Sequence, residues 1–205
     1  AGTYTLYIDG VEMNSSAGSI PISNDVDCIV GAMDQKTTPP YRPLNYFGGT
    51  LDELRIWDQA LTVNEIRTMM NQEVEDSLGA LHGSIVPLRV ASLDWIDLYG
   101  YYQMNQATDI VGGNLQSNGN SGITGRLRNM VTDQVESAPL PYLSTQNGLF
   151  FNGTTWLYGN VQQVPNNTSI NGTTPIDWNI VRTSHNVIQR NNNVVLLGLD
   201  VVSNE

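Results

Sequence analysis

Four aspartates between residues 25 and 52 have the chemistry of calcium ligands. Asp25, Asp27 and Asp34, with Asn24, form the densest acidic cluster, and Asp52 lies further along. Carboxylate and amide oxygens are the ligands that calcium prefers. Asp25 and Asp27 share a face about 6 to 7 Å apart in an extended chain. We hypothesise one calcium ion here with Asp52 as a further ligand; the alternatives are a solvated loop and an Asp52 that accepts loop N–H groups.

Two other stretches carry residues suited to sugar or protein contact. Tyr41 and Tyr46 flank the end of a proline-rich stretch, 37–45, that is predicted to be a surface loop. Exposed aromatic faces can stack on sugar rings. Asp109 and Asn118 lie in a long stretch rich in Gly, Asn and Ser, which is either a hydrophilic calcium or sugar loop or a plain flexible turn. We take these four residues as candidate ligand contacts.

The sequence indicates no active site. His82 and His185 are far apart and have no Cys or His companion at zinc spacing. His185 follows a serine, but the glycine pattern of a nucleophile elbow is absent and any acid would have to come from the fold. Asp52 and Glu53 are adjacent, so in a strand they point to opposite faces and cannot form an acid/base pair. We expect a protein that is not an enzyme.

Charge and composition exclude other classes. The 205 residues carry a net charge of -11, which repels nucleic acid and anionic membrane surfaces. No apolar run reaches the ~18 residues of a membrane helix, so we expect no membrane insertion. A single cysteine, Cys28, reads as a buried small side chain. We expect an extracellular bacterial protein without disulfides, and a piece of a longer polypeptide because the chain opens directly on a strand.

The elements that must position these residues are short strands. Charged residues make up only 14% of the chain, and turn residues recur throughout, which is typical of all-β proteins. Asp9-Gly10 predicts a hairpin turn between strands at 3–8 and 11–13, and 27–33 is predicted as the next strand.

Residues 51–57 alternate, with Leu54 and Ile56 predicted on the core face beside Asp52. Glu53 and Arg55 are then predicted as a surface ion pair on the opposite face. Thr62 and Glu65 form a capping box that predicts one short helix over 62–72.

Three sequence segments resemble a known family. These are Leu6-Tyr-Ile-Asp-Gly, Ile29-Val-Gly, and Phe47-Gly-Gly-Thr-Leu-Asp-Glu-Leu-Arg-Ile-Trp-Asp-Gln-Ala-Leu-Thr followed by Glu65-Ile. In this order they resemble the C-terminal half of a laminin-G-like, concanavalin A-like jelly roll. Leu98-Tyr-Gly-Tyr-Tyr-Gln-Met-Asn, Asp109, Asn118-Gly-Asn and Gly125-Arg-Leu-Arg-Asn-Met resemble the opening of another such domain. The remainder is similar to very large surface proteins of gliding, adhesive Bacteroidetes.

The resemblance implies a jelly-roll part over 1–73 that ends in one short helix, a linker over 74–95, and a second β-rich unit over 96–205. It implies a non-catalytic cell-surface adhesion or recognition module that binds glycan or a surface protein through its loops, in many members with calcium. Other domains of the same large chain are expected as further partners. An accessory module of a secreted polysaccharide-degrading enzyme and a purely structural spacer remain alternatives.

Overall fold

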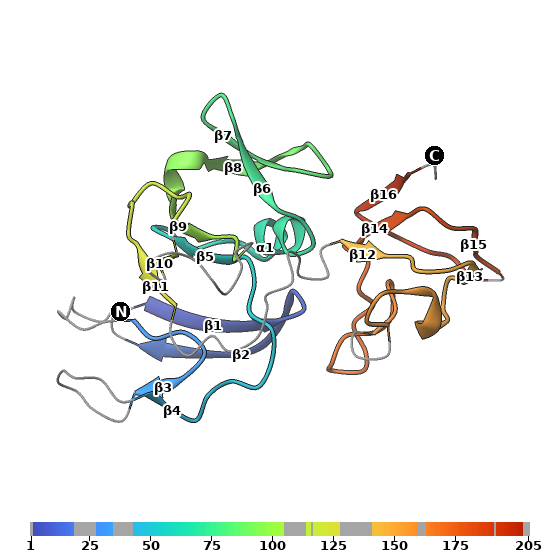
Figure 1. Ribbon diagram of the computed structural model, residues 1–205, viewed down its shortest axis with the longest axis horizontal. Coiled ribbons are helices and arrows are strands. Elements are labelled where there is room, and N and C mark those ends of the chain that lie inside the picture. The colour runs from blue at the N-terminus through green and yellow to red at the C-terminus, as the bar shows by residue number, and fades with distance from the viewer. Residues whose placement is uncertain are drawn as a thin grey trace.

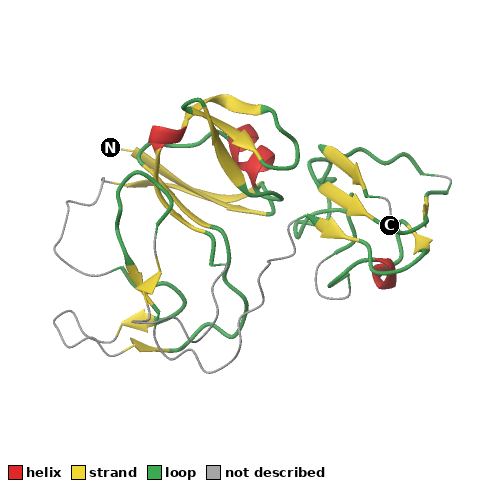
Figure 2. Ribbon diagram, turned by 45° about the horizontal axis from the view of Figure 1, so that its top comes forward, coloured by secondary structure: helices red, strands yellow, loops and turns green. Residues whose placement is uncertain are grey.

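The computed structural model describes residues 2–18, 28–34, 43–104, 114–115, 117–127, 141–159, 163–190 and 192–202. Across these residues short strands dominate, and α1 (Val63–Met69) is the one α-helix beside two 3-10 turns. Figure 2 shows the same balance of strands and connecting loops. The predicted all-β class is confirmed. In the described ranges no helix has the length and apolar character needed to cross a membrane.

The chain opens on the predicted hairpin. Strands β1 (Gly2–Ile8) and β2 (Val11–Gly18) pair antiparallel around a turn in which both central residues, Asp9 and Gly10, have positive φ. This turn suits the right-handed twist of paired strands. The strand predicted over 27–33 is wrong for most of its length. Of its described residues only Met33 is in a strand, where β3 (Met33–Asp34) pairs with β4 (Pro43–Leu44). The prediction of a buried Cys28 is also wrong, because Cys28 is exposed.

Helix α1 begins where the capping box predicts. The Thr62 hydroxyl accepts a hydrogen bond from the Glu65 backbone N–H at 3.3 Å, and the Glu65 carboxylate accepts one from the Thr62 N–H at 2.7 Å. These two bonds satisfy donors that a helix start leaves open. The helix ends at Met69, earlier than the predicted residue 72. Met69 is buried in the main core, and Met70 packs on a second cluster.

The segment 74–95 is folded. Strands β6 (Val74–Ser77), β7 (Ala80–Gly83) and β8 (Arg89–Asp94) form an antiparallel sheet, followed by the 3-10 turn η1 (Trp95–Asp97). Their apolar side chains join Met69 in the main core, whose buried members are Met69, Val74, Leu81, Val90, Leu93, Leu98 and Tyr101. The division of the chain into domains stays a prediction, but 74–95 packs with its neighbours and not as an extended connection.

Strand β9 (Leu98–Tyr102), predicted to open a second unit, pairs antiparallel with β5 (Leu54–Trp57). The face prediction for β5 is wrong. Trp57 packs against the main core, whereas Ile56 is 40% exposed. Glu53, Arg55 and Trp57 face inward, although Glu53 has a φ of +51° and the pairing with β9 shifts register between Ile56 and Trp57. The predicted sets of residues are therefore kept, but the face that is buried is the opposite one.

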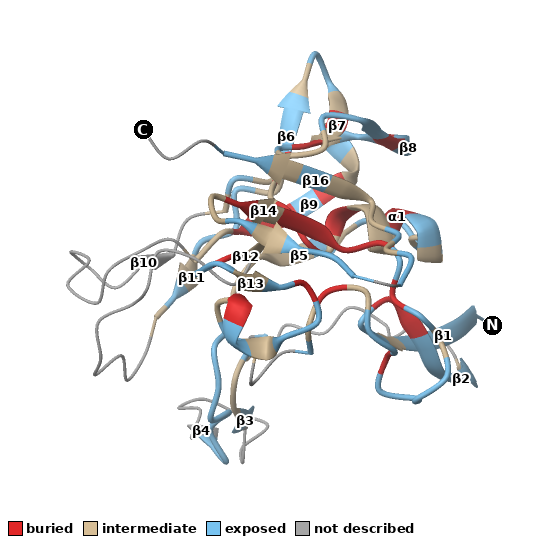
Figure 3. Ribbon diagram, turned by 90° about the vertical axis from the view of Figure 1, so that its right-hand side faces the viewer, coloured by how far each residue is buried: buried red, intermediate tan, exposed pale blue. Residues whose placement is uncertain are grey.

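The C-terminal part is a small parallel ladder. Strand β14 (Ile180–Thr183) lies between β12 (Tyr142–Leu143) and β16 (Gly198–Val201), and β13 (Gly148–Leu149) pairs with β15 (Val187–Ile188), all in parallel. Figure 3 shows buried β14 between its two neighbours. The sequence offset from β12 to β14 equals that from β13 to β15, so 142–149 stacks in register on 181–188. The short strands β10 (Asn114–Leu115) and β11 (Gly125–Arg126) and the 3-10 turn η2 (Gly153–Thr155) complete the described elements.

The ladder lies to one side of the other strands, and α1 stands between them (Figure 1). The tip of the β1–β2 hairpin joins the two parts. The Trp178 indole N–H donates to the Asp9 carbonyl at 3.2 Å, and the Arg67 guanidinium lies 3.9 Å from the centre of the Trp178 ring system. Val11, Ile176 and Trp178 form a small buried cluster at this junction.

Candidate functional site

The structure describes three of the predicted site residues, Asp52, Tyr46 and Asn118, and each has a different set of contacts. Asp52 Oδ1 accepts the Glu53 N–H at 2.9 Å, which is the alternative role considered for it. Tyr46 is 58% exposed, as the sugar-contact prediction requires. The Asn118 side-chain amide donates to Gln103 Oε1 at 2.6 Å, and its backbone N–H donates to the Tyr101 carbonyl at 2.7 Å. These contacts hold Asn118 against β9.

The other predicted residues fall outside the described part of the chain. They are Asp25, Asp27, Tyr41 and Asp109, together with the side chain of Asp34. Over the ranges that are described, no three His, Cys, Asp or Glu side chains group closely enough to hold a metal ion. The calcium hypothesis therefore stays a prediction about the cluster at 24–34.

A serine and a histidine do meet in the C-terminal ladder. Ser144 Oγ lies 2.9 Å from His185 Nδ1 and 2.9 Å from Thr183 Oγ1. The Thr183 hydroxyl donates to the His185 carbonyl, so Ser144 must donate to Thr183 and accept from the imidazole N–H. In this arrangement the imidazole is not a base toward the buried Ser144. The cluster joins the stacked segments 142–149 and 181–188.

A buried ion pair lies beneath β5. Glu53 and Arg55 side chains are each only 9% exposed and form a close ion pair, so the prediction of a surface pair is wrong in its location. Arg55 also donates to the carbonyls of Met69 and Gln72, at 2.9 and 2.7 Å. Met69 is the last residue of α1 and Gln72 follows it, at the end where a helix leaves carbonyl acceptors open. The need to satisfy them draws Arg55 inward.

Tyr101 completes this cluster. Its hydroxyl donates to the Glu53 carboxylate at 2.8 Å and accepts the Val74 N–H at 3.3 Å. Burial raises the pKa of Glu53 above its ordinary value, although the Arg55 charge acts in the opposite direction. Burial also raises the pKa of Tyr101 to about 12. The cluster is filled by its own members, and it ties β5, α1, β6 and β9 together.

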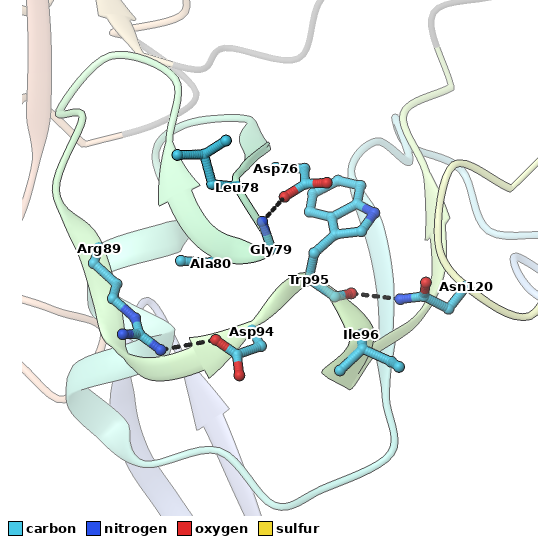
Figure 4. A pocket seen from close by; sticks show the side chains of 9 residues that line it. All are labelled: Asp76, Leu78, Gly79, Ala80, Arg89, Asp94, Trp95, Ile96 and Asn120. Atoms are coloured by element: carbon cyan, nitrogen blue, oxygen red, sulfur yellow. Dashed lines mark hydrogen bonds and ion pairs between the residues drawn. The ribbon is translucent and has the colours of Figure 1, made fainter.

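A shallow, open pocket lies at the β6–β7–β8 sheet. A cavity of about 450 Å³ opens to solvent and is lined by Asp76, Leu78, Gly79, Ala80, Arg89, Asp94, Trp95, Ile96 and Asn120. Figure 4 shows these side chains, which come from β6, β7 and the turn between them, from β8 and η1, and from the loop that follows β9. The cavity has the size of an ordinary small-molecule pocket. We call it the η1 pocket.

One wall of the η1 pocket is a strained turn. Leu78 and Gly79 both have positive φ, +56° and +89°, and the Asp76 carboxylate accepts the Gly79 N–H at 2.7 Å. Asparagine, aspartate or glycine is the usual first residue of such a turn, whereas leucine is a backbone outlier. The Leu78 side chain is fully exposed, with a relative accessibility of 106%. An exposed apolar side chain on a strained backbone leads to the hypothesis that Leu78 contacts a ligand.

The adjoining wall is fixed by hydrogen bonds. The Trp95 N–H donates to the Gly79 carbonyl at 2.8 Å, and the Trp95 ring meets Tyr101 edge-to-face with centroids 6.1 Å apart. The Asn120 side-chain amide donates to the carbonyls of Trp95 and Leu98. Gly119 permits this close approach, because a Cβ there would lie 2.8 Å from the Leu98 carbonyl oxygen.

Most residues of this pocket are not predicted from the sequence. Asn120 belongs to the predicted polar loop, but the sequence predicts a linker over 74–95. The available signal was Leu78-Gly79 between two strand-length segments, which is a hairpin pattern with an unusual first turn residue. The meeting of η1 with the loop around Asn120 depends on long-range pairing that no local pattern specifies.

A comparison with protein families supports the N-terminal resemblance. Residues 1–67 match a laminin-G-type family model described as the Concanavalin A-like lectin/glucanases superfamily. The N-terminal part of the chain is thus similar to this superfamily, which supports a carbohydrate- or protein-binding module. No curated protein and no solved structure shows significant similarity to the chain. The η1 pocket lies outside the matched residues.

Proposed function

We propose that this chain is a non-catalytic, extracellular recognition module of a larger cell-surface protein, and that it binds glycan at the η1 pocket. The observation that carries the proposal is the composition of the pocket walls. Ile96 and Leu78 are 70% and 106% exposed, and they stand beside carboxylate and amide groups. Sugars present apolar C–H faces edged by hydroxyl groups, so such a wall suits them.

Binding without catalysis fits the roles of the pocket carboxylates. Asp76 accepts a turn N–H, and Asp94 pairs with Arg89 at 2.7 Å. Both acids therefore serve the local structure and form a wall. The calcium ion considered for the cluster at 24–34 and the adhesive role belong to the same proposal, and the superfamily match supports them only at the level of a binding module.

A glycan array with the whole chain, run with and without calcium, tests this function. We expect Ile96→Ala to lower binding to the best glycan at least fivefold, because it removes an exposed apolar contact. Ile188→Ala on β15 is the matched control, since Ile188 is also exposed at 46% but does not line the pocket. A wild-type chain that binds no glycan, or two variants that bind equally well, would refute the proposal.

A further inference from the structure

The polar groups that the η1 pocket offers to a ligand are mainly hydrogen-bond acceptors. Both amide hydrogens of Asn120 are used by the carbonyls of Trp95 and Leu98. Because those partners only accept, the amide nitrogen must face them and the Asn120 oxygen is left for a ligand. The available side of Asn120 is therefore an acceptor.

The acids add acceptors of the same kind. Asp76 uses Oδ1 for the Gly79 N–H, and Asp94 uses Oδ1 for Arg89 and also accepts the Asp97 N–H in the capping box of η1. A carboxylate offers about four lone-pair sites, so both acids keep acceptor capacity for a ligand. Arg89 directs one terminal nitrogen at Asp94 and, more weakly, at the Ser92 carbonyl. Figure 4 shows Arg89 and Asp94 paired along one side of the pocket.

Charge points the same way as the acceptors. Two carboxylates and one guanidinium line the pocket, and the whole chain carries a net charge of -11. A ligand that brings carboxylate or sulfate groups would add acceptors to acceptors and negative charge to negative charge. An ammonium group brings three donors and no acceptor.

We propose that the η1 pocket selects saccharides that carry a positively charged amino group over their N-acetylated and acidic counterparts. This rests on the proposed glycan-binding function and adds the class of sugar. The ammonium group lies between the carboxylates of Asp76 and Asp94, and the sugar ring lies on Ile96 and Leu78.

Calorimetric titration of the whole chain at about pH 6, where such an amine is protonated, tests the proposal. The probes are three tetrasaccharides: a glucosamine oligomer, its N-acetylated form and a galacturonate oligomer. We expect the glucosamine oligomer to bind at least tenfold more tightly than the acetylated form, and the galacturonate oligomer to bind most weakly. Added salt should reduce the preference for the amino form.

Asp76→Asn should reduce the preference for the amino sugar to about threefold or less while the affinity for the acetylated form changes little. Asp177→Asn, at an exposed position away from the pocket, is the control and should keep the full preference. If none of the three oligomers binds but the array shows another glycan that does, only this inference fails; if the array is blank as well, the proposed function fails. If they bind without an amino preference, or if the galacturonate oligomer binds best, only this inference fails. Equal competition by tetralysine would show a basic peptide site and would also overturn it.

Discussion

Glu53 lies where a charge is poorly solvated. Its carboxylate pairs with Arg55 and Tyr101, and its Oε1 atom is buried without a hydrogen-bond partner among the described residues. Replacing water by one cation rarely restores the full hydration of a buried carboxylate. The raised pKa of Glu53 reflects this balance. The pair positions the end of α1, and the desolvation of its two charges offsets part of their attraction.

This raised pKa predicts a sign for the pH dependence of stability. Between the ordinary pKa of 4.5 and the raised folded value, the folded state binds more protons at Glu53 than the unfolded state does. The contribution of Glu53 to stability is therefore present at low pH and is lost as the pH rises through this window. Glu53→Gln should remove that contribution.

Urea unfolding of the wild type and of Glu53→Gln at several pH values checks this prediction. The free energy of unfolding of the wild type relative to the variant should fall as the pH rises above about 4.5 and then level off. Asp177→Asn, an exposed acid, should show no such trend. A difference that grows with pH would contradict the assigned direction.

At the scale of elements, the exposed Leu78 lowers the stability of the β6–β7 turn, because it has a left-handed backbone conformation. A side chain in the left-handed region costs about 1 kcal/mol, and asparagine tolerates this conformation better than leucine. Leu78 has a φ of +56°, so Leu78→Asn should raise the free energy of unfolding by about 1 kcal/mol. The same change should weaken glycan binding.

Chemical denaturation and the glycan titration together test this trade-off. Leu88→Asn is the control, because Leu88 is also well exposed, at 61%, and has no positive φ. It should leave both readouts nearly unchanged. A Leu78→Asn variant that is less stable, or that binds glycan normally, would argue against a functional reason for the turn.

The elements that the sequence predicted well are those defined by neighbouring residues. Asp9-Gly10 locates the turn between β1 and β2, and the Thr62–Glu65 capping box locates the start of α1. Each signal lies within a few residues of the element it predicts. The pairing of β5 with β9 joins residues more than forty positions apart, and the inward position of Arg55 depends on its contacts with the carbonyls of Met69 and Gln72, which no pattern within the strand specifies. The η1 pocket combines three such segments, so no local pattern could reveal it.

At the scale of the whole molecule, Gly10 is the point where the two parts meet. It has a φ of +72°, and a Cβ there would lie 2.9 Å from Arg67 Cγ and 2.9 Å from the Trp178 indole nitrogen. Gly172 has the same φ of +72° but open space around it. The two glycines therefore separate the cost of backbone conformation from the cost of crowding.

Gly10→Ala should destabilise the protein more than Gly172→Ala, because both pay about 1 kcal/mol for the left-handed backbone and only the first must also displace Arg67 or Trp178. Urea unfolding measures the two losses, and limited proteolysis should cut Gly10→Ala faster between the two parts. Equal losses of stability would show that the Arg67–Trp178 stack yields without cost and does not join the parts.

The parallel ladder also has a consequence for solubility. Strand β16 pairs on one side with β14, and on this strand Leu199 and Val201 are 60% and 70% exposed. It belongs to the apolar run 194–202, in which Asp200 is the one charged residue. Such runs at sheet edges template aggregation unless a charge interrupts them. Because Arg182 partly neutralises Asp200 at 2.7 Å, the colloidal behaviour of the isolated chain depends on a single gatekeeper carboxylate.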